Sequence, residues 1–199
     1  MIVLSQNHKE NRAMKIAFIT TNKGKFEEVE SLFKDYNIAL EWVNRKYEED
    51  SDDSIEDTAK KAAKKLANEL NKPIILEDTG LFFDAYEGFP GPSPKFVFKT
   101  LGYKGIFKLL DGISRKAYFQ TFAAYCEPGS EPLLFSGKMK GKIAKKIYNL
   151  KKDFDFMPYD RIFVPEGESV TISDMTMEEK NRLSQRSKAF RKLGDYLNK

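Results

Sequence analysis

The chain has little histidine, little cysteine and no long apolar run, and each shortage excludes a class of chemistry. Its one histidine, His8, precedes the first predicted strand, so a Ser-His-Asp triad, a Cys-His pair and a multi-histidine zinc site are all disfavoured. Its one cysteine, Cys126, lies in an apolar run and is interpreted as a buried hydrophobe rather than a nucleophile. Catalysis is left to carboxylates and lysines, and carboxylates favour a hard cation such as magnesium.

Membrane and dinucleotide-binding signals are also missing. No apolar run approaches the roughly 18 residues that cross a bilayer, and the N-terminus has no secretory apolar core, so we expect a cytoplasmic protein without a membrane partner. Neither a glycine-rich dinucleotide fingerprint nor a Walker loop is present. What is present, 41% hydrophobic residues and 16 phenylalanines in 199 residues, predicts a substantial core in one domain, alone or with a small lobe.

The net charge of +4 raises nucleic-acid binding as an alternative function. The densest basic cluster consists of Lys60, Lys61, Lys64 and Lys65. At about 100° per residue these lysines share one face of a helix, opposite an apolar face, which is typical of a solvated surface. No aromatic side chains alternate with them to form a stacking platform, so a nucleic-acid partner is disfavoured.

The hydrophobic pattern predicts alternating strands and helices followed by hairpins. Residues 1–13 are weakly patterned and are expected to be a flexible N-terminal extension to a single domain over 14–199. The expected strands cover 16–21, 38–43, 74–77, 115–127 and 133–147, and the expected helices follow Asn22, cover 54–70 and 96–110, and follow Thr176. This order predicts an α/β fold with a long, twisted mixed sheet, βαβ at one end and antiparallel hairpins at the other.

Two adjacent carboxylates, Glu77 and Asp78, directly follow the apolar run Ile74-Ile75-Leu76. Ligands collect at the carboxyl ends of strands in open α/β sheets, so this run predicts a strand that ends at a binding site. The alternative interpretation is a plain turn at the end of a strand.

Two further polar segments are compatible with anion sites and with ordinary surface. In residues 20–25, Thr-Thr-Asn-Lys-Gly-Lys, a strand runs into a helix N-terminus, where free backbone N–H groups and the helix dipole favour phosphate. Such a segment is also a common turn. Residues 179–186 combine Lys180, Arg182 and Arg186, and this segment is equally compatible with a solvated helix. Neither segment decides the function by itself.

Taken together and in order, the segments resemble the inosine/xanthosine triphosphate pyrophosphatase family. The resemblance runs from Met14 to the C-terminus, and its five motifs are Thr21-Asn22 with Lys25, Glu77-Asp78-Thr79-Gly80-Leu81, Gly88-Phe89-Pro90-Gly91, Tyr159-Asp160 with Ile162-Phe163, and Glu178-Glu179-Lys180-Asn181 with Ser184-Gln185-Arg186. It implies an elongated sheet forming two lobes around a central nucleotide cleft. It also implies a cytoplasmic homodimer that uses Mg²⁺ to hydrolyse ITP, dITP and XTP to the monophosphate and pyrophosphate.

The resemblance implies roles on the phosphate side of the site. Asp78 would orient or deprotonate the attacking water and help to hold Mg²⁺, and Glu49, from the acidic stretch 48–53, would be the second metal ligand. Lys25 and Lys180 would neutralise phosphate oxygens. Hydrogen bonds to these oxygens would come from Thr21, Asn22 and Thr79.

The base side of the site is where the chain departs from the family pattern. The resemblance implies that Arg186 donates to O6 of a 6-keto purine, a bond that a 6-amino group cannot accept, and that Asp160 accepts from N1–H. Tyr159 and Gln185 complete the expected base site. The departures are Gln185 in place of histidine, Phe156-Met157-Pro158 in place of Gly-aromatic-Gly, and Arg161 in place of proline.

Two alternatives to a working pyrophosphatase remain at this point. The first is a divergent paralogue that binds nucleotides with altered specificity or little turnover, for which nucleotides would stabilise the protein without release of pyrophosphate. The second is a basic nucleic-acid-binding protein, for which binding would fall steeply with salt.

Overall fold

A computed structural model describes residues 14–199 except 49, 51–52 and 150–156. Its strands are β1 (Met14–Ile19), β2 (Ile38–Val43), β3 (Ile74–Phe83), β4 (Pro90–Gly91), β5 (Lys116–Cys126), β6 (Leu133–Ile143) and β7 (Phe163–Pro165). Its helices are α1 (Lys23–Phe33), α2 (Ile55–Leu70), α3 (Pro94–Leu109), α4 (Met177–Leu183) and α5 (Gln185–Leu197), with 3₁₀ helices η1 (Lys34–Tyr36), η2 (Pro158–Arg161) and η3 (Ile172–Asp174).

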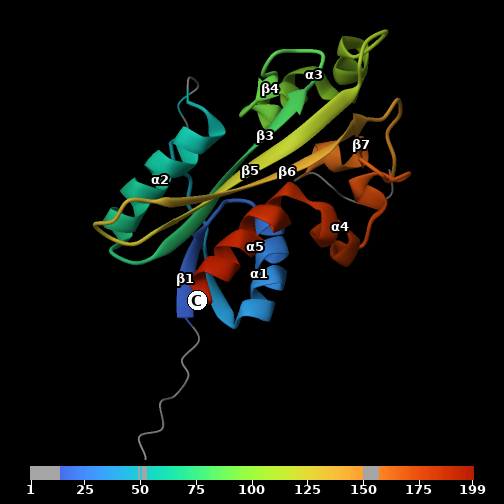
Figure 1. The fold of residues 1–199 in the computed structure, drawn as a ribbon. Helices are drawn as coiled ribbons and strands as arrows, with labels where there is room; N and C mark the ends of the chain where they lie inside the picture. The colour runs from blue at the N-terminus through green and yellow to red at the C-terminus, as the bar shows by residue number, and fades with distance from the viewer. Residues whose placement is uncertain (1–13, 49, 51–52, 150–156) are drawn as a thin grey trace, which may run out of the picture.

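The strands form one mixed sheet in the order β2-β1-β3-β5-β6-β7, with β4 paired to β3. β1 pairs in parallel with β2 and β3, whereas the pairs β3–β5, β5–β6 and β6–β7 are antiparallel. Figure 1 shows α2 on one face of the sheet and α1 with α5 on the other, while β5 and β6 run on to the region of α3 and β7. The predicted fold, with βαβ at one end and hairpins at the other, is confirmed.

The helix starts follow the capping residues that the sequence offers. The side chain of Asn22 accepts from the Lys25 backbone N–H at the start of α1, and Ser54 does the same for Asp57 at the start of α2. Thr176 and Glu179 form a reciprocal capping box at α4. α3 has a break at Gly102, whose φ of 58° lies in the left-handed region that glycine adopts readily.

The third strand is longer than the sequence pattern predicts. A strand over 74–77 would end at Glu77, but β3 continues to Phe83, so Glu77 and Asp78 lie in the middle of the strand. The reason is pairing: β3 stays in register with β5 from Ile74 opposite Cys126 to Phe83 opposite Ala117. Only the first residues of β3 pair with β1, at Ile74 and Ile75, so the carboxylates lie just past the end of the parallel part of the sheet.

Three apolar clusters form the core, one for each group of helices. One packs α1 and α5 on the sheet around Phe18, Phe33 and Phe190. A second packs α2 on the opposite face and includes Cys126, which is buried as predicted. The third lies at the far end of β3, β5 and β6 and includes Tyr159. The two ends of the sheet are therefore packed independently, with a polar zone between them.

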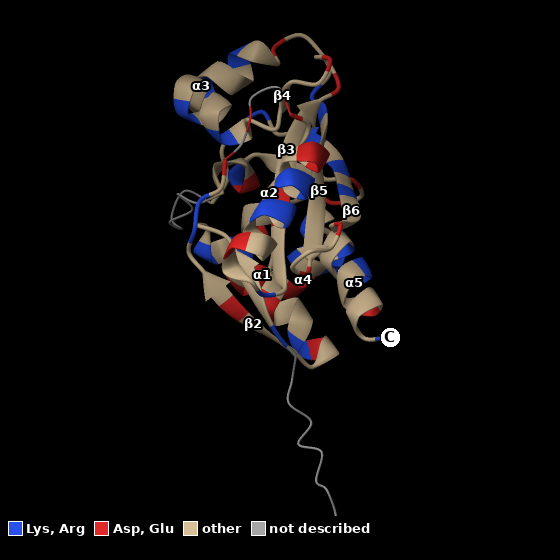
Figure 2. Ribbon diagram, turned by 90° about the vertical axis from the view of Figure 1, so that its left-hand side faces the viewer, with Lys and Arg blue, Asp and Glu red and all other residues tan. Residues whose placement is uncertain are grey.

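The basic face of α2 is solvated, as the sequence predicts. Its four clustered lysines are exposed, while Ala59, Ala62 and Leu66 are buried against the sheet. Figure 2 shows the basic positions along α2 in blue. Lys61, Lys64 and Lys65 form ion pairs with Asp53, Glu131 and Glu48. Among the described residues, no helix is both long and apolar enough to span a bilayer.

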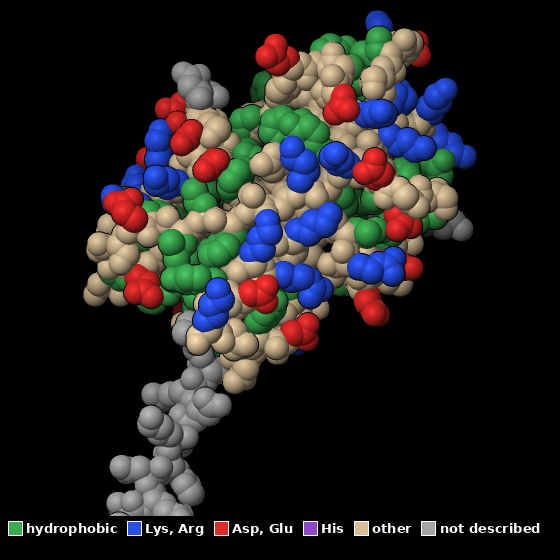
Figure 3. Space-filling model, in the orientation of Figure 1, with side chains coloured by type: hydrophobic (Ala, Val, Ile, Leu, Met, Phe, Trp, Pro, Cys, Tyr) green, Lys and Arg blue, Asp and Glu red, His purple; other side chains and the backbone are tan. Residues whose placement is uncertain are grey.

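The free edge of β6 is covered by lysines from α5. Lys188 Nζ donates to the carbonyl of Lys138 at 3.0 Å, and Lys192 Nζ donates to the carbonyl of Ser136 at 2.6 Å. Figure 3 shows basic side chains over this face of the molecule. Charged side chains on an exposed strand edge oppose pairing with another chain, so these two lysines are explained by the fold.

Candidate active site

A cavity of about 390 Å³ lies in the polar zone between the two ends of the sheet. Its walls come from the turn after β1, the loop after β2, the middle of β3, the start of α3, η2 and the helices α4 and α5. All the described residues that the sequence predicted for the site line this cavity: Thr21, Asn22, Lys25, Asp78, Thr79, Tyr159, Asp160, Lys180, Gln185 and Arg186. Residues far apart in the chain are thus brought to one place, as in the bond between Glu28 and Ser184, 156 positions apart.

The turn between β1 and α1 is held in one shape by its own polar groups. Asn22 N donates to Thr20 Oγ1 at 3.1 Å, and Asn22 Oδ1 accepts from Lys25 N at 3.2 Å. The indole of Trp42 donates to the carbonyl of Thr20 at 2.8 Å. The N-terminus of α1 therefore faces the cavity in a fixed orientation, where its backbone N–H groups and dipole favour an anion.

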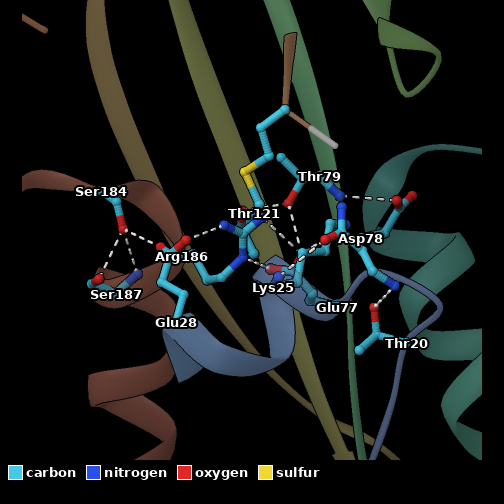
Figure 4. Close-up of polar contacts among 12 residues, drawn as sticks. Thr20, Lys25, Glu28, Glu77, Asp78, Thr79, Thr121, Ser184, Arg186 and Ser187 are labelled. Carbon is cyan, nitrogen blue, oxygen red and sulfur yellow. Dashed lines mark hydrogen bonds and ion pairs between the residues drawn. The ribbon is translucent and has the colours of Figure 1, made fainter. Parts of the chain in front are cut away.

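Glu77 and Asp78 point to opposite faces of β3, as adjacent residues of a strand do (Figure 4). Glu77 points towards Arg186 and Lys25, on the face covered by α1 and α5. Asp78 points to the other side, where its Oδ1 accepts from the backbone N–H of Thr79 at 2.9 Å. The two carboxylates are adjacent in the sequence, but their side chains therefore lie in different environments on the two faces of β3.

Arg186 lies between two buried carboxylates (Figure 4). Its Nε and Nη2 donate to Glu77 at 2.8 and 3.1 Å, and its Nη1 donates to Glu28 at 2.7 Å. Arg186 is 3% exposed, Glu77 is 2% and Glu28 is 1%. Ser184, the cap of α5, completes this arrangement by donating to the other oxygen of Glu28 at 3.0 Å.

Lys25 and Lys180 are paired with the same carboxylates from the cavity side. Lys25 Nζ lies 2.8 Å from Glu77 Oε1. Lys180 Nζ lies 3.0 Å from Asp160 Oδ2 and 3.4 Å from Glu28 Oε2. The predicted phosphate-binding lysines therefore belong to a continuous chain of ion pairs that joins α1, β3, η2, α4 and α5.

The ion pairs keep this network charged although it is buried. Burial opposes ionisation of Glu77, but the charges of Arg186 and then Lys25 outweigh it and lower its pKa to about 2. Burial also opposes ionisation of Glu28, and Arg186 with Lys180 still lowers its pKa below the usual value. Burial disfavours the charged form of Lys180, but Asp160 and Glu28 raise its pKa above that of an ordinary lysine.

The upper wall of the cavity combines an aromatic side chain with a carboxylate. The hydroxyl of Tyr159 donates to the carbonyl of Pro94 at 3.0 Å, and burial raises the pKa of this hydroxyl. The ring of Tyr159 therefore forms part of the cavity wall, and its hydroxyl links η2 to α3. Its neighbour Asp160 forms an ion pair with Lys180. Apolar lining comes from Phe119, Met139, Met157 and Ile172. This end of the cavity suits a flat ring.

Gln185 lies at the first position of α5 and is 6% exposed. Its side-chain oxygen is buried and accepts no hydrogen bond from the described residues. An unsatisfied buried acceptor costs about 1 to 3 kcal/mol, so a donor from a ligand is favoured there.

The backbone of Gln185 is close to the sheet because Gly137 of β6 has no side chain. A Cβ at Gly137 would lie 2.0 Å from the Gln185 backbone carbonyl oxygen.

Sequence reasoning missed several residues of the site. Glu28 was not predicted, although it follows Lys25 by three positions and so shares its face of α1. Glu77 was noticed only as a member of the acidic pair. The cavity is also lined by Arg45, Lys46, Tyr47 and Lys95, which carry no motif. Only the packing of the loop after β2 and of α3 against the cavity brings them there.

The donor set suits a metal that is shared with a ligand. Asp78 lines the cavity with a carboxylate, whereas Glu77 is held by two cations. No group of three or more potential metal-ligating side chains occurs in the part of the chain that the structure describes. Mg²⁺ is usually bound by one or two carboxylates together with waters and phosphate oxygens, so Asp78 fits such an ion. The predicted ligand Glu49 lies outside the described residues.

Comparison with known proteins gives matches along nearly the whole chain. Two curated dITP/XTP pyrophosphatases are similar to this chain. That of Methanopyrus kandleri is 41% identical over 184 residues, covering 92% of this chain and 96% of the relative. That of Thermococcus kodakarensis is 40% identical over 185 residues, covering 92% and 97%.

Solved structures share the fold. The Ham1 protein of Coxiella burnetii matches with a TM-score of 0.75 at 23% identity, covering 92% of this chain and 98% of that one. The Ham1 protein of Staphylococcus aureus matches with a TM-score of 0.72 at 24% identity, covering 92% and 97%. The model of the Ham1 family matches residues 16–196, and this chain therefore belongs to the Ham1 family.

Proposed function

We propose that this chain hydrolyses non-standard purine nucleoside triphosphates (ITP, dITP and XTP) to the monophosphate and pyrophosphate. The observation that carries the proposal is one cavity that combines a helix N-terminus, a carboxylate on β3 and an apolar end closed by Tyr159. The dITP/XTP pyrophosphatases of Methanopyrus kandleri and Thermococcus kodakarensis, at 41% and 40% identity, support it.

Asp78 is the proposed catalytic group. The oxygen of a water attacks the α-phosphorus, the bond from that phosphorus to the bridging oxygen breaks, and pyrophosphate leaves. Asp78 orients this water or accepts its proton, and its carboxylate would also hold Mg²⁺, with Glu49 as the second proposed ligand. When bound, Mg²⁺ would supply positive charge to the phosphate oxygens. Thr21, Asn22 and Thr79 would donate hydrogen bonds to these oxygens.

The base would lie at the apolar end of the cavity. Gln185 offers an acceptor that lacks a donor among the described residues, and Asp160 offers carboxylate oxygens. N–H groups of a 6-keto purine suit such acceptors. The three guanidinium nitrogens of Arg186 already donate to Glu77 and Glu28, so its proposed contact with O6 would use its remaining N–H hydrogens.

The test is the release of pyrophosphate, as opposed to phosphate, from ITP, XTP, GTP and ATP with Mg²⁺. Release from ITP and XTP that is lost on omitting Mg²⁺ supports the proposal. No release from any purine triphosphate contradicts it, and nucleotide-induced thermal stabilisation in that case would indicate a binding protein without turnover. The homodimer is part of the proposal, and sedimentation at monomer mass would contradict that part.

A further inference from the structure

Trp42 is the single tryptophan of the chain, and core burial does not explain its place. It lies in β2, at the edge of the sheet, and is 38% exposed. The hydrophobic effect stabilises a side chain in proportion to the apolar area that it buries, so an exposed edge position is a weak reason for a tryptophan. Its position is instead defined by two contacts of the indole ring, one polar and one aromatic.

The polar contact joins Trp42 to the turn between β1 and α1. Its Nε1 donates to the backbone carbonyl of Thr20 at 2.8 Å, across 22 positions of the chain. Among the apolar aromatic side chains only tryptophan has an N–H donor, so a phenylalanine at this position would lose the bond. Thr20 is buried, so water has little access to replace the indole.

The aromatic contact keeps the indole in place. The ring of Trp42 stacks on that of Phe26, with the centroids 5.7 Å apart and an interplanar angle of 21°. Phe26 belongs to the first turn of α1, and its backbone nitrogen donates to the carbonyl of Asn22 at 3.2 Å. One side chain of β2 is therefore attached both to the turn and to the helix that follows it.

The backbone of Thr20 is fixed by β2 on both sides. Its nitrogen donates to the carbonyl of Val43 at 3.2 Å, and its carbonyl accepts from Trp42. The C=O and N–H groups of a planar trans peptide point in opposite directions, so the N–H of Thr21 points away from Trp42. Thr20 and Thr21 line the cavity and Trp42 does not. The Thr21 N–H has no acceptor among the described residues, which leaves it available to a ligand.

We propose that Trp42 is a positioning residue for the nucleotide: its indole keeps the Thr20 carbonyl turned towards β2, so that the Thr21 N–H donates to a phosphate oxygen. If this peptide rotated, its carbonyl oxygen would face the anion and repel it. The inference rests on the proposed function, because it concerns the same cavity. A hydrogen bond to a charged oxygen, formed in the bound state alone, is worth about a tenfold change in affinity.

The experiment measures binding of a non-hydrolysable inosine α,β-imidotriphosphate by calorimetry and follows the Thr21 amide signal by NMR. One variant is Trp42→Phe. The other has 3-benzothienylalanine at position 42, which replaces the indole N–H by sulfur and keeps the shape of the ring. The control is Tyr36→Phe, which removes a hydroxyl that donates to Asp195 at 2.9 Å, beyond the other end of α1.

We expect both variants at position 42 to bind the analogue about tenfold more weakly than the wild-type chain, and the control less than about twofold more weakly. The Thr21 amide proton should move downfield when the analogue binds to the wild-type chain, and this shift should be lost in both variants. A purely structural role of Trp42 would lower the melting temperature and change neither readout, because both are measured on the folded protein.

Two results would overturn the inference: affinities of both variants within about twofold of the wild-type value, or a Thr21 amide that does not respond to the analogue in the wild-type chain. Neither readout needs turnover. A wild-type chain that binds the analogue but releases no pyrophosphate would contradict the proposed function and still decide the inference. A wild-type chain that does not bind the analogue would contradict both.

Discussion

Arg186 and Glu77, 109 positions apart in the chain, form a two-bond ion pair with both side chains almost fully buried. The pair joins the start of α5 to the middle of β3 and lies directly under the cavity. A buried charge that loses its partner destabilises a protein strongly, so this contact fixes the cavity floor and explains why the network stays ionised.

Replacing one partner should therefore cost much stability. We expect Glu77→Gln to lower the free energy of unfolding by about 3 kcal/mol, because Arg186 and Lys25 would lose their shared anion. Urea denaturation measures the change. Glu27→Gln, which removes an exposed carboxylate of α1, is the control and should cost less than about 1 kcal/mol. Similar values for both variants would show that the buried pair does not stabilise the fold.

Acid should destabilise the protein through the same carboxylate. Burial opposes ionisation of Glu77, but Arg186 and Lys25 bring its pKa to about 2, against 4.5 for an ordinary glutamate. A lowered folded-state pKa gives stability that is fully present above pH 4.5 and is lost as the pH falls towards 2. The loss amounts to about 3 kcal/mol. The free energy of unfolding should depend less on pH between 4.5 and 2 in Glu77→Gln than in the wild-type chain. An equal pH dependence in both would contradict the assignment.

Asp78 should be needed for turnover and not for folding. We expect Asp78→Asn to lower kcat by about 10² to 10⁴-fold, since an amide cannot accept the proton of the attacking water. The melting temperature should stay within a few degrees, because Asp78 is not part of the Arg186 ion pairs. Asp84→Asn, an exposed residue just after β3, is the control. Full activity of Asp78→Asn would remove it from the mechanism.

Gln185 should influence the choice of base. Its buried side-chain oxygen has no partner among the described residues, so it is available to a base N–H. If the amide recognises the keto edge less well than an imidazole, Gln185→His should raise kcat/KM for ITP relative to ATP, because ATP carries a 6-amino group in place of the keto oxygen. Steady-state kinetics with both nucleotides measure the ratio. An unchanged ratio would show that this position does not set base preference.

Gly137 should be intolerant of any side chain. Its Cβ would lie 2.0 Å from the carbonyl oxygen of Gln185 and 2.8 Å from the backbone nitrogen of Ala189. We expect Gly137→Ala to push α5 away from β6 and to destabilise the protein by about 1 to 3 kcal/mol. Thermal unfolding measures this effect, with Ser136→Ala as the neighbouring control. Equal melting temperatures would mean that α5 shifts without cost.

The order of helices and strands was predictable because it depends on local signals. Period-two and period-3.6 patterns place β2, α2 and β5 within a residue or so of their observed bounds. The caps Asn22, Ser54 and Thr176 mark helix starts because their side chains bond backbone groups only three positions away. The end of β3 was not predictable in this way, because Asp78 and Thr79 stay extended through pairing with β5.

By itself, the sequence determined the α/β fold, the family resemblance and the motif residues that line the cavity, because these follow from local patterning and from motifs in order. Only the tertiary structure decided what those residues do to one another. It pairs Arg186 with Glu28 across 158 positions, and it brings Lys46 and Lys95 to the cavity wall. Contacts between distant residues depend on how helices pack on the sheet, and no local pattern in the chain encodes them.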